Sequence, residues 1–341
     1  MKSKLLLIAI AALFLSTGWT IRDLGALPGG TMSSANAINN SHAIAGQGTN
    51  SAGVVRAIWW DAAGVLREIP TPVIAGRFSA AYDINETSIV VGRVGTATSD
   101  GHAFKYQGGV LTDLTASLSS IAFSINNSNH IAGQWSEAGT PPRHYAVVWS
   151  GGAPGIPAWI GGLGGLIDFA SDISNANVIA GTVALSGTPV RRHAFLWKSG
   201  VMRDLGTLGG NNSFGRALEA PGTSDGSIYV VGESEITPGS FDTRAFLYHL
   251  GTMYNLGTLP GCTTTQAYGI NKMKHVVGTC HGGGISRAWL YRSGTMVDLH
   301  TLLPPGSGWE SLQDARDIND YGEIVGSGLY FGKTRAFVMT P

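Results

Sequence analysis

The chain has 341 residues, enough for one large domain with a sizeable core. Only 13% of the residues are charged and 22 basic residues balance 22 acidic ones, which argues against a nucleic-acid or anionic-membrane binder. Its 49 glycines fall largely between short apolar runs, a pattern typical of a multi-stranded all-β protein.

Residues 1–18 have the pattern of a secretory signal peptide. Two lysines precede an apolar run over 5–15, and Ser16 and Gly18 supply small residues for cleavage after Gly18. The alternative is a transmembrane anchor, but the run is shorter than the roughly 20 residues needed to cross a bilayer. We therefore expect the mature chain, 19–341, to be secreted to the periplasm or the extracellular space, with no stable membrane span.

Three short motifs then recur in a fixed order along the chain. The first is A-x-x-I-N, a turn and V-V-G, with copies at Ile38 and Gly46, Ile84 and Gly92, Ile125 and Gly133, Ile173 and Gly181, Leu218 and Gly232, Ile270 and Gly278, and Ile318 and Gly326. The second has HAFLW as its clearest copy and lies at 56–60, 102–106, 145–149, 193–197, 244–248, 287–291 and 335–339. The third has MRDLG as its clearest copy and lies at 66–70, 111–115, 157–161, 202–206, 253–257 and 296–300.

These motifs predict four short strands in each repeat, which we call a (A-x-x-I-N), b (V-V-G), c (HAFLW) and d (DLG). The glycines of strand b are 41 to 51 residues apart, a period that suits the blade of a propeller. Helical repeats are excluded because the segments are short, β-branched and aromatic, with glycine between them. We expect strand a to be innermost, with hairpin turns joining a to b and c to d on one face, the short-turn face. The longer b–c and d–a connections then emerge on the opposite, long-loop face.

The two ends of the repeat array complement each other. The last repeat stops after its second motif, and the missing third motif stands at 19–25, WTIRDLG, directly after the predicted cleavage site. An open solenoid is the alternative, but it would carry capping repeats at both ends. We therefore predict an all-β fold: one seven-bladed β-propeller of four-stranded blades over 19–341, its last blade closed by the N-terminal strand. Closure removes the exposed strand edges.

The recurring HAFLW and DLGTLGG pattern, clearest at 193–210, resembles the HAF-repeat family of predicted bacterial extracellular proteins. The resemblance covers essentially the whole mature chain and is looser in the third repeat, where Tyr145, Ala146 and Val147 replace His-Ala-Phe. It implies export and a repeat architecture, and it brings no catalytic residues.

One position of strand a varies among the repeats while its neighbours do not. Two residues before the isoleucine stand Asn36, Tyr82, Phe123, Ser171, Arg216, Tyr268 and Arg316. We predict that Tyr82, Arg216, Tyr268 and Arg316 face a ligand at the channel mouth of the long-loop face, because aromatic faces and guanidinium forks suit sugars or carboxylates. The alternative is that these side chains wedge between blades.

Other candidate residues have ordinary explanations. The position before Ala-Phe holds histidine or arginine in different repeats, which indicates a scaffold role rather than catalysis; its copies include His102, His193, Arg56, Arg244, Arg287 and Arg335. The G-x-S-x-G match at 222–226 lies in the enlarged turn of the fifth repeat, where no strand–turn–helix elbow is expected. Cys262 and Cys280 can form a disulfide in a secreted chain or remain two free thiols. We predict no catalytic residue, metal or cofactor.

The regular repeats, with no unit carrying its own acid–base set, favour a non-catalytic binding or structural protein. We expect it to recognise an extracellular glycan or protein through the long-loop face. One alternative is a glycan hydrolase or lyase at the channel mouth, for which Asp83, Asp172 and Asp317 are the recurring carboxylates. Another is self-assembly, with the strand at 19–25 inserted into a neighbouring subunit.

Overall fold

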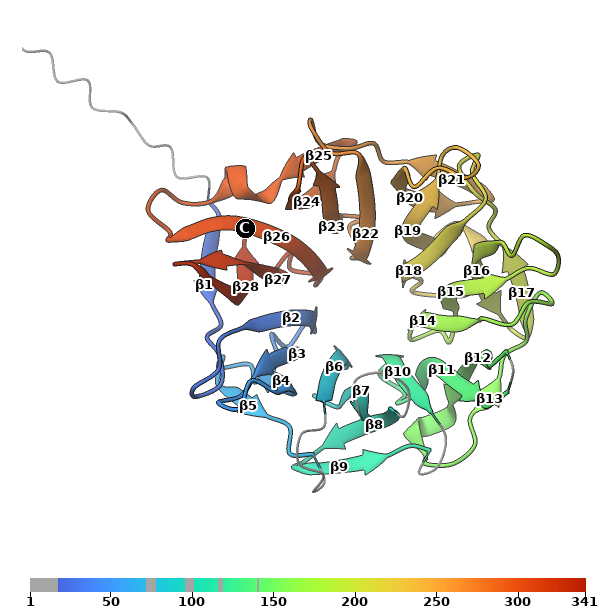
Figure 1. Ribbon diagram of the computed structural model, residues 1–341, viewed down its shortest axis with the longest axis horizontal. Coiled ribbons are helices and arrows are strands. Elements are labelled where there is room, and N and C mark those ends of the chain that lie inside the picture. Colours follow the sequence, from blue (N-terminus) through green and yellow to red (C-terminus); the bar gives the residue numbers. More distant parts are fainter. Residues whose placement is uncertain (1–17, 72–77, 96–100, 116–118, 140) are drawn as a thin grey trace, which may run out of the picture.

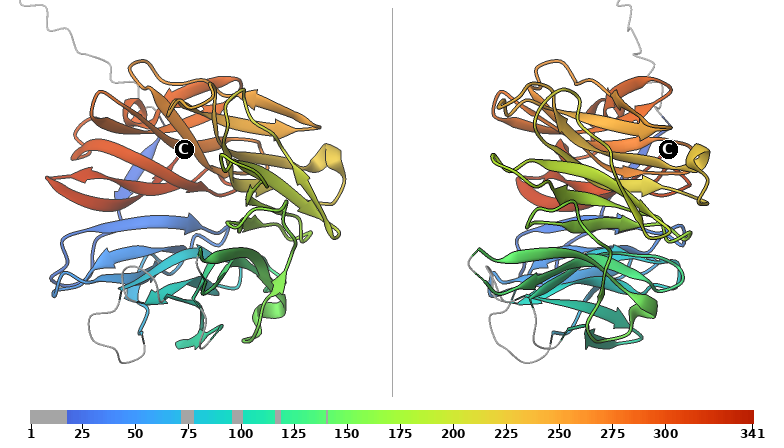
Figure 2. Two further views of the ribbon diagram at one scale, coloured as in Figure 1. Left: turned by 45° about the vertical axis from the view of Figure 1, so that its right-hand side comes forward. Right: turned by 90° about the vertical axis from the view of Figure 1, so that its right-hand side faces the viewer.

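The computed structural model describes residues 18–71, 78–95, 101–115, 119–139 and 141–341, so most of the predicted signal peptide lies outside the described residues. Within these ranges, 28 strands form seven antiparallel sheets of four strands each, arranged in a ring (Figure 1). The turned views in Figure 2 show the sheets following one another around this ring, each facing its neighbours. The predicted seven-bladed β-propeller is confirmed.

Strands a and b occupy the two inner positions of every blade. The a strands are β2 (Ser33–Ile38), β6 (Phe78–Ile84), β10 (Ser120–Ile125), β14 (Phe169–Ile173), β18 (Ser213–Glu219), β22 (Thr264–Ile270) and β26 (Trp309–Ile318). The b strands are β3 (Ile44–Thr49), β7 (Val90–Gly95), β11 (Ile131–Glu137), β15 (Ile179–Ala184), β19 (Tyr229–Glu235), β23 (Val276–Gly282) and β27 (Ile324–Tyr330). Blades are numbered 1 to 7 in this order.

Strands c and d form the outer half of each blade. The c strands are β4 (Val55–Trp60), β8 (His102–Gln107), β12 (Arg143–Trp149), β16 (Arg192–Lys198), β20 (Thr243–His249), β24 (Ile285–Arg292) and β28 (Lys333–Thr340). The d strands are β5 (Leu66–Glu68), β9 (Val110–Asp113), β13 (Ala158–Trp159), β17 (Val201–Asp204), β21 (Thr252–Asn255), β25 (Thr295–Asp298) and, for blade 7, β1 (Thr20–Asp23). Three short 3-10 helices lie among the described residues: η1 (Ser150–Gly152), η2 (Asp225–Ser227) and η3 (Leu299–Leu302).

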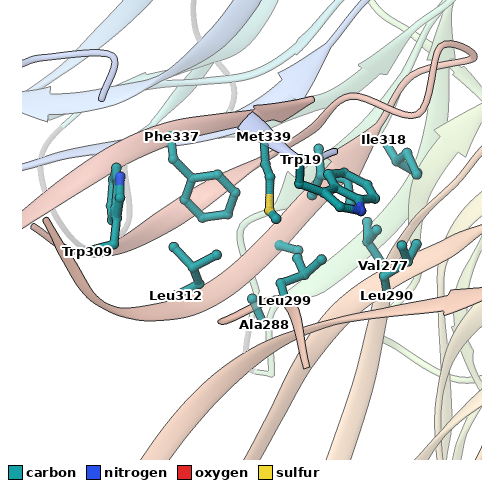
Figure 3. Packing of buried hydrophobic residues seen from close by; sticks show 12 residues of the cluster. Trp19, Val277, Ala288, Leu290, Leu299, Trp309, Leu312, Ile318, Phe337 and Met339 are labelled. Atoms are coloured by element: carbon teal, nitrogen blue, oxygen red, sulfur yellow. The ribbon is translucent and has the colours of Figure 1, made fainter. Parts of the chain in front are cut away.

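The N-terminal strand closes the ring within the same chain. β1 pairs with β28 in antiparallel register, with Thr20 opposite Thr340 and Asp23 opposite Phe337. Trp19, just before β1, is 7% exposed and packs in one buried cluster with Phe337 and Met339 (Figure 3). Burying an aromatic side chain of this size contributes about 1.5–3 kcal/mol, so the closure combines a strand ladder with a hydrophobic anchor.

The glycine of V-V-G lets strands a and c pack tightly against strand b. A Cβ placed on Gly181 would lie 2.1 Å from the Phe169 carbonyl oxygen and 2.8 Å from the Phe195 ring. Because one of these neighbours is backbone, the clash could not be relieved by turning a side chain. The glycine of V-V-G and the phenylalanine of the HAF motif therefore recur together because they pack directly against each other.

In blades 1, 2, 3 and 5, a buried serine at the start of strand a ties the blade to the one before it. Ser213 Oγ of blade 5 accepts a hydrogen bond from Ala194 N of blade 4 at 2.8 Å and donates to Gly206 O at 2.6 Å. Ser33 makes the same two contacts across the closure, to Ala336 N at 3.0 Å and Gly25 O at 2.5 Å. The HAF and DLG motifs thus supply backbone groups that the next blade satisfies.

In blades 1, 2 and 4, the residue at the first position of the HAF motif pairs with an acidic residue of strand d. His193 Nδ1 lies 2.9 Å from the Asp204 carboxylate and His102 Nδ1 lies 2.7 Å from Asp113, while Arg56 takes the same role with Glu68 at 2.7 Å. Histidine and arginine are interchangeable here because each offers a donor to the neighbouring carboxylate. The contact joins strands c and d on the outside of the blade.

Candidate functional site

Every a strand contains a β-bulge at the variable position. At this position the pairing register of strands a and b shifts in every blade, so the residue there has no partner in the ladder; blade 7 has two further shifts nearer the start of its strand a. The seven residues are Asn36, Tyr82, Phe123, Ser171, Arg216, Tyr268 and Arg316. We call this set the bulge ring. Bulges redirect a side chain out of the pleat, which explains why this position differs between repeats while its neighbours are constrained.

The bulge ring lines one cavity at the long-loop end of the channel. All seven members border a space of about 840 Å³, and the lining also includes Phe78, Phe169, Gln47, Gln134 and His144. The structure therefore brings together the four residues selected from the sequence, Tyr82, Arg216, Tyr268 and Arg316. The volume is in the range of sites for small ligands and short peptides, not of a surface for a folded partner.

The cavity has two chemically different walls. Aromatic rings line the wall of blades 2 to 4: Tyr82 lies 5.9 Å from Phe123, and Phe123 lies 6.2 Å from Phe169. We call these three residues with Phe78 the aromatic arc. The opposite wall, on blades 5 to 7, holds Arg216, Tyr268 and Arg316, here called the arginine arc. Because seven blades close the ring, blade 7 stands across the channel from blades 3 and 4 (Figure 1).

Arg216 is neutralised by a buried carboxylate. Its Nε lies 3.0 and 3.2 Å from the two carboxylate oxygens of Glu233, a residue of β19 that is only 3% exposed, and a second guanidinium nitrogen also bonds Glu233. Burial lowers the pKa of Arg216 while the Glu233 carboxylate raises it, and the net direction is upward. Arg216 is thus a fixed, paired cation.

Arg316 is held differently. Its guanidinium lies 4.6 Å from the centre of the Tyr268 ring, and its Nε lies 3.5 Å from Asp314 Oδ1 without forming a hydrogen bond. The Asp314 carboxylate already accepts bonds from the N and Oγ of Ser327, at 3.0 and 2.8 Å. Arg316 and Asp314 therefore form an ion pair without a hydrogen bond. The Arg316 side chain is 40% exposed and its terminal nitrogens make no hydrogen bond within the described residues, so these nitrogens are available to the cavity.

Tyrosine hydroxyls complete both walls. Burial raises the pKa of Tyr82 and of Tyr268 above the ordinary value, so both phenols are neutral at physiological pH. The Tyr268 hydroxyl donates to Gln266 Oε1. These groups bind by stacking and hydrogen bonding and do not contribute charge.

Three partly buried aspartates, each directly after a residue of the bulge ring in sequence, connect neighbouring blades. Asp83 accepts the N–H of Ile125, Asp172 that of Leu218 and Asp317 that of Ile38, at 2.8 to 2.9 Å. Burial raises the pKa of Asp83 to about 6 and that of Asp317 to about 7, and it also raises the pKa of Asp172. Their oxygens are engaged by backbone amides, so they do not form the free acid–base pair that the glycosidase alternative required.

One serine–histidine pair lies at the edge of the cavity, and the sequence motifs did not reveal it. His144 lines the cavity, and its Nδ1 lies 2.7 Å from Ser136 Oγ on the neighbouring strand. Burial lowers the pKa of His144, which favours the neutral imidazole. Blade 6 has a similar pair in reverse order, His281 and Ser286 at 2.8 Å, which is not part of the cavity lining. In both pairs, the serine and the histidine stand directly opposite each other on strands b and c. The sequence did not predict them because the other repeats carry different residues at these positions.

The serine of the G-x-S-x-G match, Ser224, is not part of a serine–histidine pair in the described structure and does not line the cavity. Ser224 lies in the enlarged a–b turn of blade 5, next to η2, and its carbonyl accepts bonds from Ser227. A three-residue 3-10 helix follows it instead of the long helix of a nucleophile elbow.

The other mouth of the channel, on the short-turn face, is occupied by hydrogen bonds between blades. Five asparagines after the isoleucine of strand a form what we call the asparagine belt. Each donates its Nδ2 to a carbonyl of the next blade: Asn39 to Asn85, Asn85 to Asn126, Asn126 to Ser174, Asn271 to Asn319 and Asn319 to Asn39. The cavity there measures about 400 Å³. Its recurring residues serve assembly of the ring.

Cys262 and Cys280 form a disulfide in blade 6. Across the described ranges, no three His, Cys, Asp or Glu side chains gather in a way that could hold a metal ion. The same residues include no helix that is both long and apolar enough to cross a membrane.

No family model and no curated protein match this sequence. Solved structures do resemble the fold. A puromycin-hydrolyzing peptidase of Mycobacterium tuberculosis matches with a TM-score of 0.56 and 14% identity, over 90% of this chain and 53% of the peptidase. A prolyl endopeptidase matches with a TM-score of 0.59 and 11% identity, over 91% of this chain and 50% of the other. The β-propeller domain of the Trilobed protease from Pyrococcus furiosus, described as having an open velcro topology, matches with a TM-score of 0.55 and 10% identity, over 91% and 93%.

These similarities overturn the function expected from the sequence. The prediction of a non-catalytic module for an extracellular glycan or protein was wrong, because the similar structures are peptidases. The reasoning failed because regular repeats were taken as a sign of no catalysis. In the structure that regularity comes from contacts between blades, which say nothing about activity. At 10–14% identity the similarity shows the fold alone, and this chain spans about half the length of the two whole peptidases.

Proposed function

We propose that the cavity of the long-loop face receives peptides or peptide-like amides for hydrolysis, outside the cytoplasm. The observation that carries this proposal is the convergence of the whole bulge ring on one cavity with an aromatic and a cationic wall. The peptidases among the similar structures support the choice of substrate class. The signal-peptide pattern and the resemblance of the repeats to the HAF-repeat family support the location.

The remaining lining suits a peptide backbone. A peptide group has one donor and one acceptor, and side-chain amides can satisfy both at once. Gln47, Gln134 and Asn36 place three such amides around the cavity. Gln134 Nε2 makes only a long contact, 3.4 Å, to the Asp168 carbonyl, so this amide is available to a ligand. The aromatic arc then offers apolar surface to the side chains.

The chain also contains a pair of groups suited to the hydrolytic step. In this proposal Ser136 Oγ attacks the amide carbonyl carbon, while His144 takes the hydroxyl proton and returns it to the leaving amine as the C–N bond breaks. Water then attacks the acyl ester, with His144 again taking and returning a proton, and releases the acid and free Ser136. The neutral state of His144, favoured by its burial, is the state that a general base needs.

The test uses the mature chain with a set of short peptides that carry aromatic or aliphatic residues. Binding is measured by calorimetry and cleavage by the appearance of new amino termini. We expect Phe123→Ala to weaken binding at least tenfold, because it removes the centre of the aromatic arc. Tyr254→Ala is the matched control, since Tyr254 is an aromatic residue on the outer strand β21 that is 52% exposed. The proposal fails if no peptide binds or if the two variants behave alike.

The hydrolytic step has its own control within the ring. We expect Ser136→Ala to abolish the release of amino termini and leave peptide binding intact. Ser286→Ala removes the serine of the blade 6 pair and should leave both unchanged. Cleavage that persists in Ser136→Ala, or its absence from the unaltered chain, contradicts this part of the proposal.

A further inference from the structure

We infer that the cavity selects peptides by their free C-terminal carboxylate, which Arg316 binds while a large apolar side chain near that end lies on the aromatic arc. This inference rests on the proposed function and narrows its substrate class. It concerns which end of a peptide enters the cavity and which side chains are preferred there.

The first argument is the difference between the two arginines. Glu233 occupies the guanidinium of Arg216 through several hydrogen bonds, so Arg216 has little left for a ligand. Arg316 forms only a loose ion pair with Asp314, 3.5 Å from its buried Nε, and Asp314 is already bonded to Ser327. Its two terminal nitrogens make no hydrogen bond within the described residues, and they are the donors left for a ligand. A guanidinium with unused donors binds a carboxylate through two parallel hydrogen bonds. Arg316 is therefore the anchor, and Tyr268 holds its plane by stacking.

The second argument is the sign of the charges in the lining. The charged residues among the described lining are Arg216, which is paired with Glu233, and Arg316, and the lining includes no aspartate or glutamate. A free peptide amino terminus is a cation and needs acceptors with negative charge. A free carboxyl terminus is an anion and meets the cationic wall. The lining thus favours the C-terminal end of a peptide over its N-terminal end.

The third argument is the position of the apolar wall. Arg316 belongs to blade 7, and Phe123 and Phe169 belong to blades 3 and 4, on the far side of the channel. A ligand whose carboxylate bonds Arg316 and whose body crosses the cavity presents its side chain to these rings. Aromatic and large aliphatic side chains gain most from such a surface, because burial of their area supplies the free energy. Small or charged side chains near the C-terminus gain little.

The test compares peptides that differ only at their ends. N-acetyl-Ala-Ala-Phe with a free carboxylate is compared with its C-terminal amide and with H-Ala-Ala-Phe-amide, which has a free amino terminus. We expect the free carboxylate to bind the unaltered protein at least tenfold more tightly than either amide. In Arg316→Gln this preference should disappear, and in Arg316→Lys it should be reduced, because lysine keeps the charge and loses the two-pronged geometry.

The matched control is Arg67→Gln on blade 1. Arg67 is an exposed arginine paired with Asp61 and lies outside the cavity lining, so the preference should persist in this variant. Arg316→Gln should lower the melting temperature only slightly, since it removes a loose, partly exposed ion pair with Asp314 and a contact with the Tyr268 ring but no hydrogen bond. A second series replaces the terminal phenylalanine by glycine, and at least a tenfold loss of affinity is expected.

The outcomes separate this inference from the proposed function. Equal binding of the carboxylate and the amides overturns the inference and leaves peptide binding in place. A preference that survives both Arg316 variants overturns the role of Arg316. Failure of every peptide to bind overturns the inference and the proposed function together.

Discussion

The two mouths of the channel are built by the two ends of the same seven strands, but they use their polar groups differently. At the short-turn mouth, Asn39 and the other residues of the asparagine belt use both the Nδ2 and the Oδ1 of their side-chain amides in hydrogen bonds within the ring. At the long-loop mouth, the terminal nitrogens of Arg316 make no hydrogen bond within the described residues, and Gln134 makes only a long one. The side-chain amides of the asparagine belt at the short-turn mouth are hydrogen-bonded within the ring, whereas polar groups at the long-loop mouth are available to a ligand.

This difference separates the repeat positions that stabilise the ring from those that can bind a ligand. A position that every blade must fill in the same way, such as the asparagine belt, holds neighbouring blades together. The bulge ring lies outside the strand ladder, so its side chains are free of that demand and vary from blade to blade. Variation at a fixed place in a closed ring gathers seven side chains of five kinds around one cavity. The comparison predicts that substitutions at one mouth change stability and those at the other change binding.

The largest effect is expected at the asparagine belt. Asn39→Ala removes the acceptor of the Ala43 N–H and the donor to the Asn85 carbonyl, and Asn39 is 5% exposed. The substitution leaves the buried Ala43 N–H without a partner and takes one of two hydrogen bonds from the Asn85 carbonyl, which keeps the bond from Ser88 N–H. Together these losses cost about 2–4 kcal/mol of unfolding free energy. Urea denaturation should show this loss, while affinity for the carboxylate peptide stays unchanged.

Asn50→Ala is the control for that substitution. Asn50 accepts the N–H groups of Ala52 and Val54 in a similar local turn, but its side chain forms no bond to another blade in the described structure. We expect a loss of about 1 kcal/mol or less, because this turn is open to water. If Asn39→Ala costs no more than Asn50→Ala, the belt does not hold the ring together.

The next largest effect is a pH dependence of stability, which we expect from Asp317, one of the three aspartates that connect neighbouring blades. Burial raises the pKa of Asp317 to about 7, above its value in the unfolded chain, so the folded state binds this proton more tightly. Its contribution to stability is therefore complete below the unfolded pKa and is lost as pH rises through about 7. The difference in unfolding free energy between the unaltered protein and Asp317→Asn should grow by about 1–3 kcal/mol from pH 8 to pH 5.

Comparison with Asp317→Asn is needed because two histidines act in the opposite direction. Burial lowers the pKa of His144 and of His275, so their charging destabilises the folded state as pH falls. Both histidines remain in the variant, and their effect cancels in the difference. Urea unfolding at pH 5, 6.5 and 8 measures it. A difference that does not change with pH contradicts the prediction.

The sequence predicted the ring and much of the cavity for one reason, the strict spacing of the repeats. Counting the DLG motifs located the closing strand at 19–25, and aligning the A-x-x-I-N motifs singled out Arg216 and Arg316. The spacing could not show that these residues are bulges, because a bulge depends on pairing with strand b. Phe169 and His144 were missed because they stand outside the repeated motifs. The predicted function class, a non-catalytic binding protein, was wrong because regular repeats are expected in the scaffold of a binding protein and in that of a hydrolase.

The smallest effect sharpens the contrast between the two arginines. Glu233→Gln keeps the shape of the side chain and removes its charge, so Arg216 loses its counter-ion. Because the Arg216 side chain is 34% exposed, water offsets part of this change, and we expect a loss of about 1–2 kcal/mol in stability. The freed guanidinium should also raise affinity for the carboxylate peptide by about three- to tenfold, since it becomes a second anion site. Glu219→Gln is the matched control, because Glu219 pairs with Lys274 at the short-turn mouth, 3.7 Å away. If both variants leave peptide affinity unchanged, Glu233 does not keep Arg216 from the ligand and the distinction between the two arginines is lost.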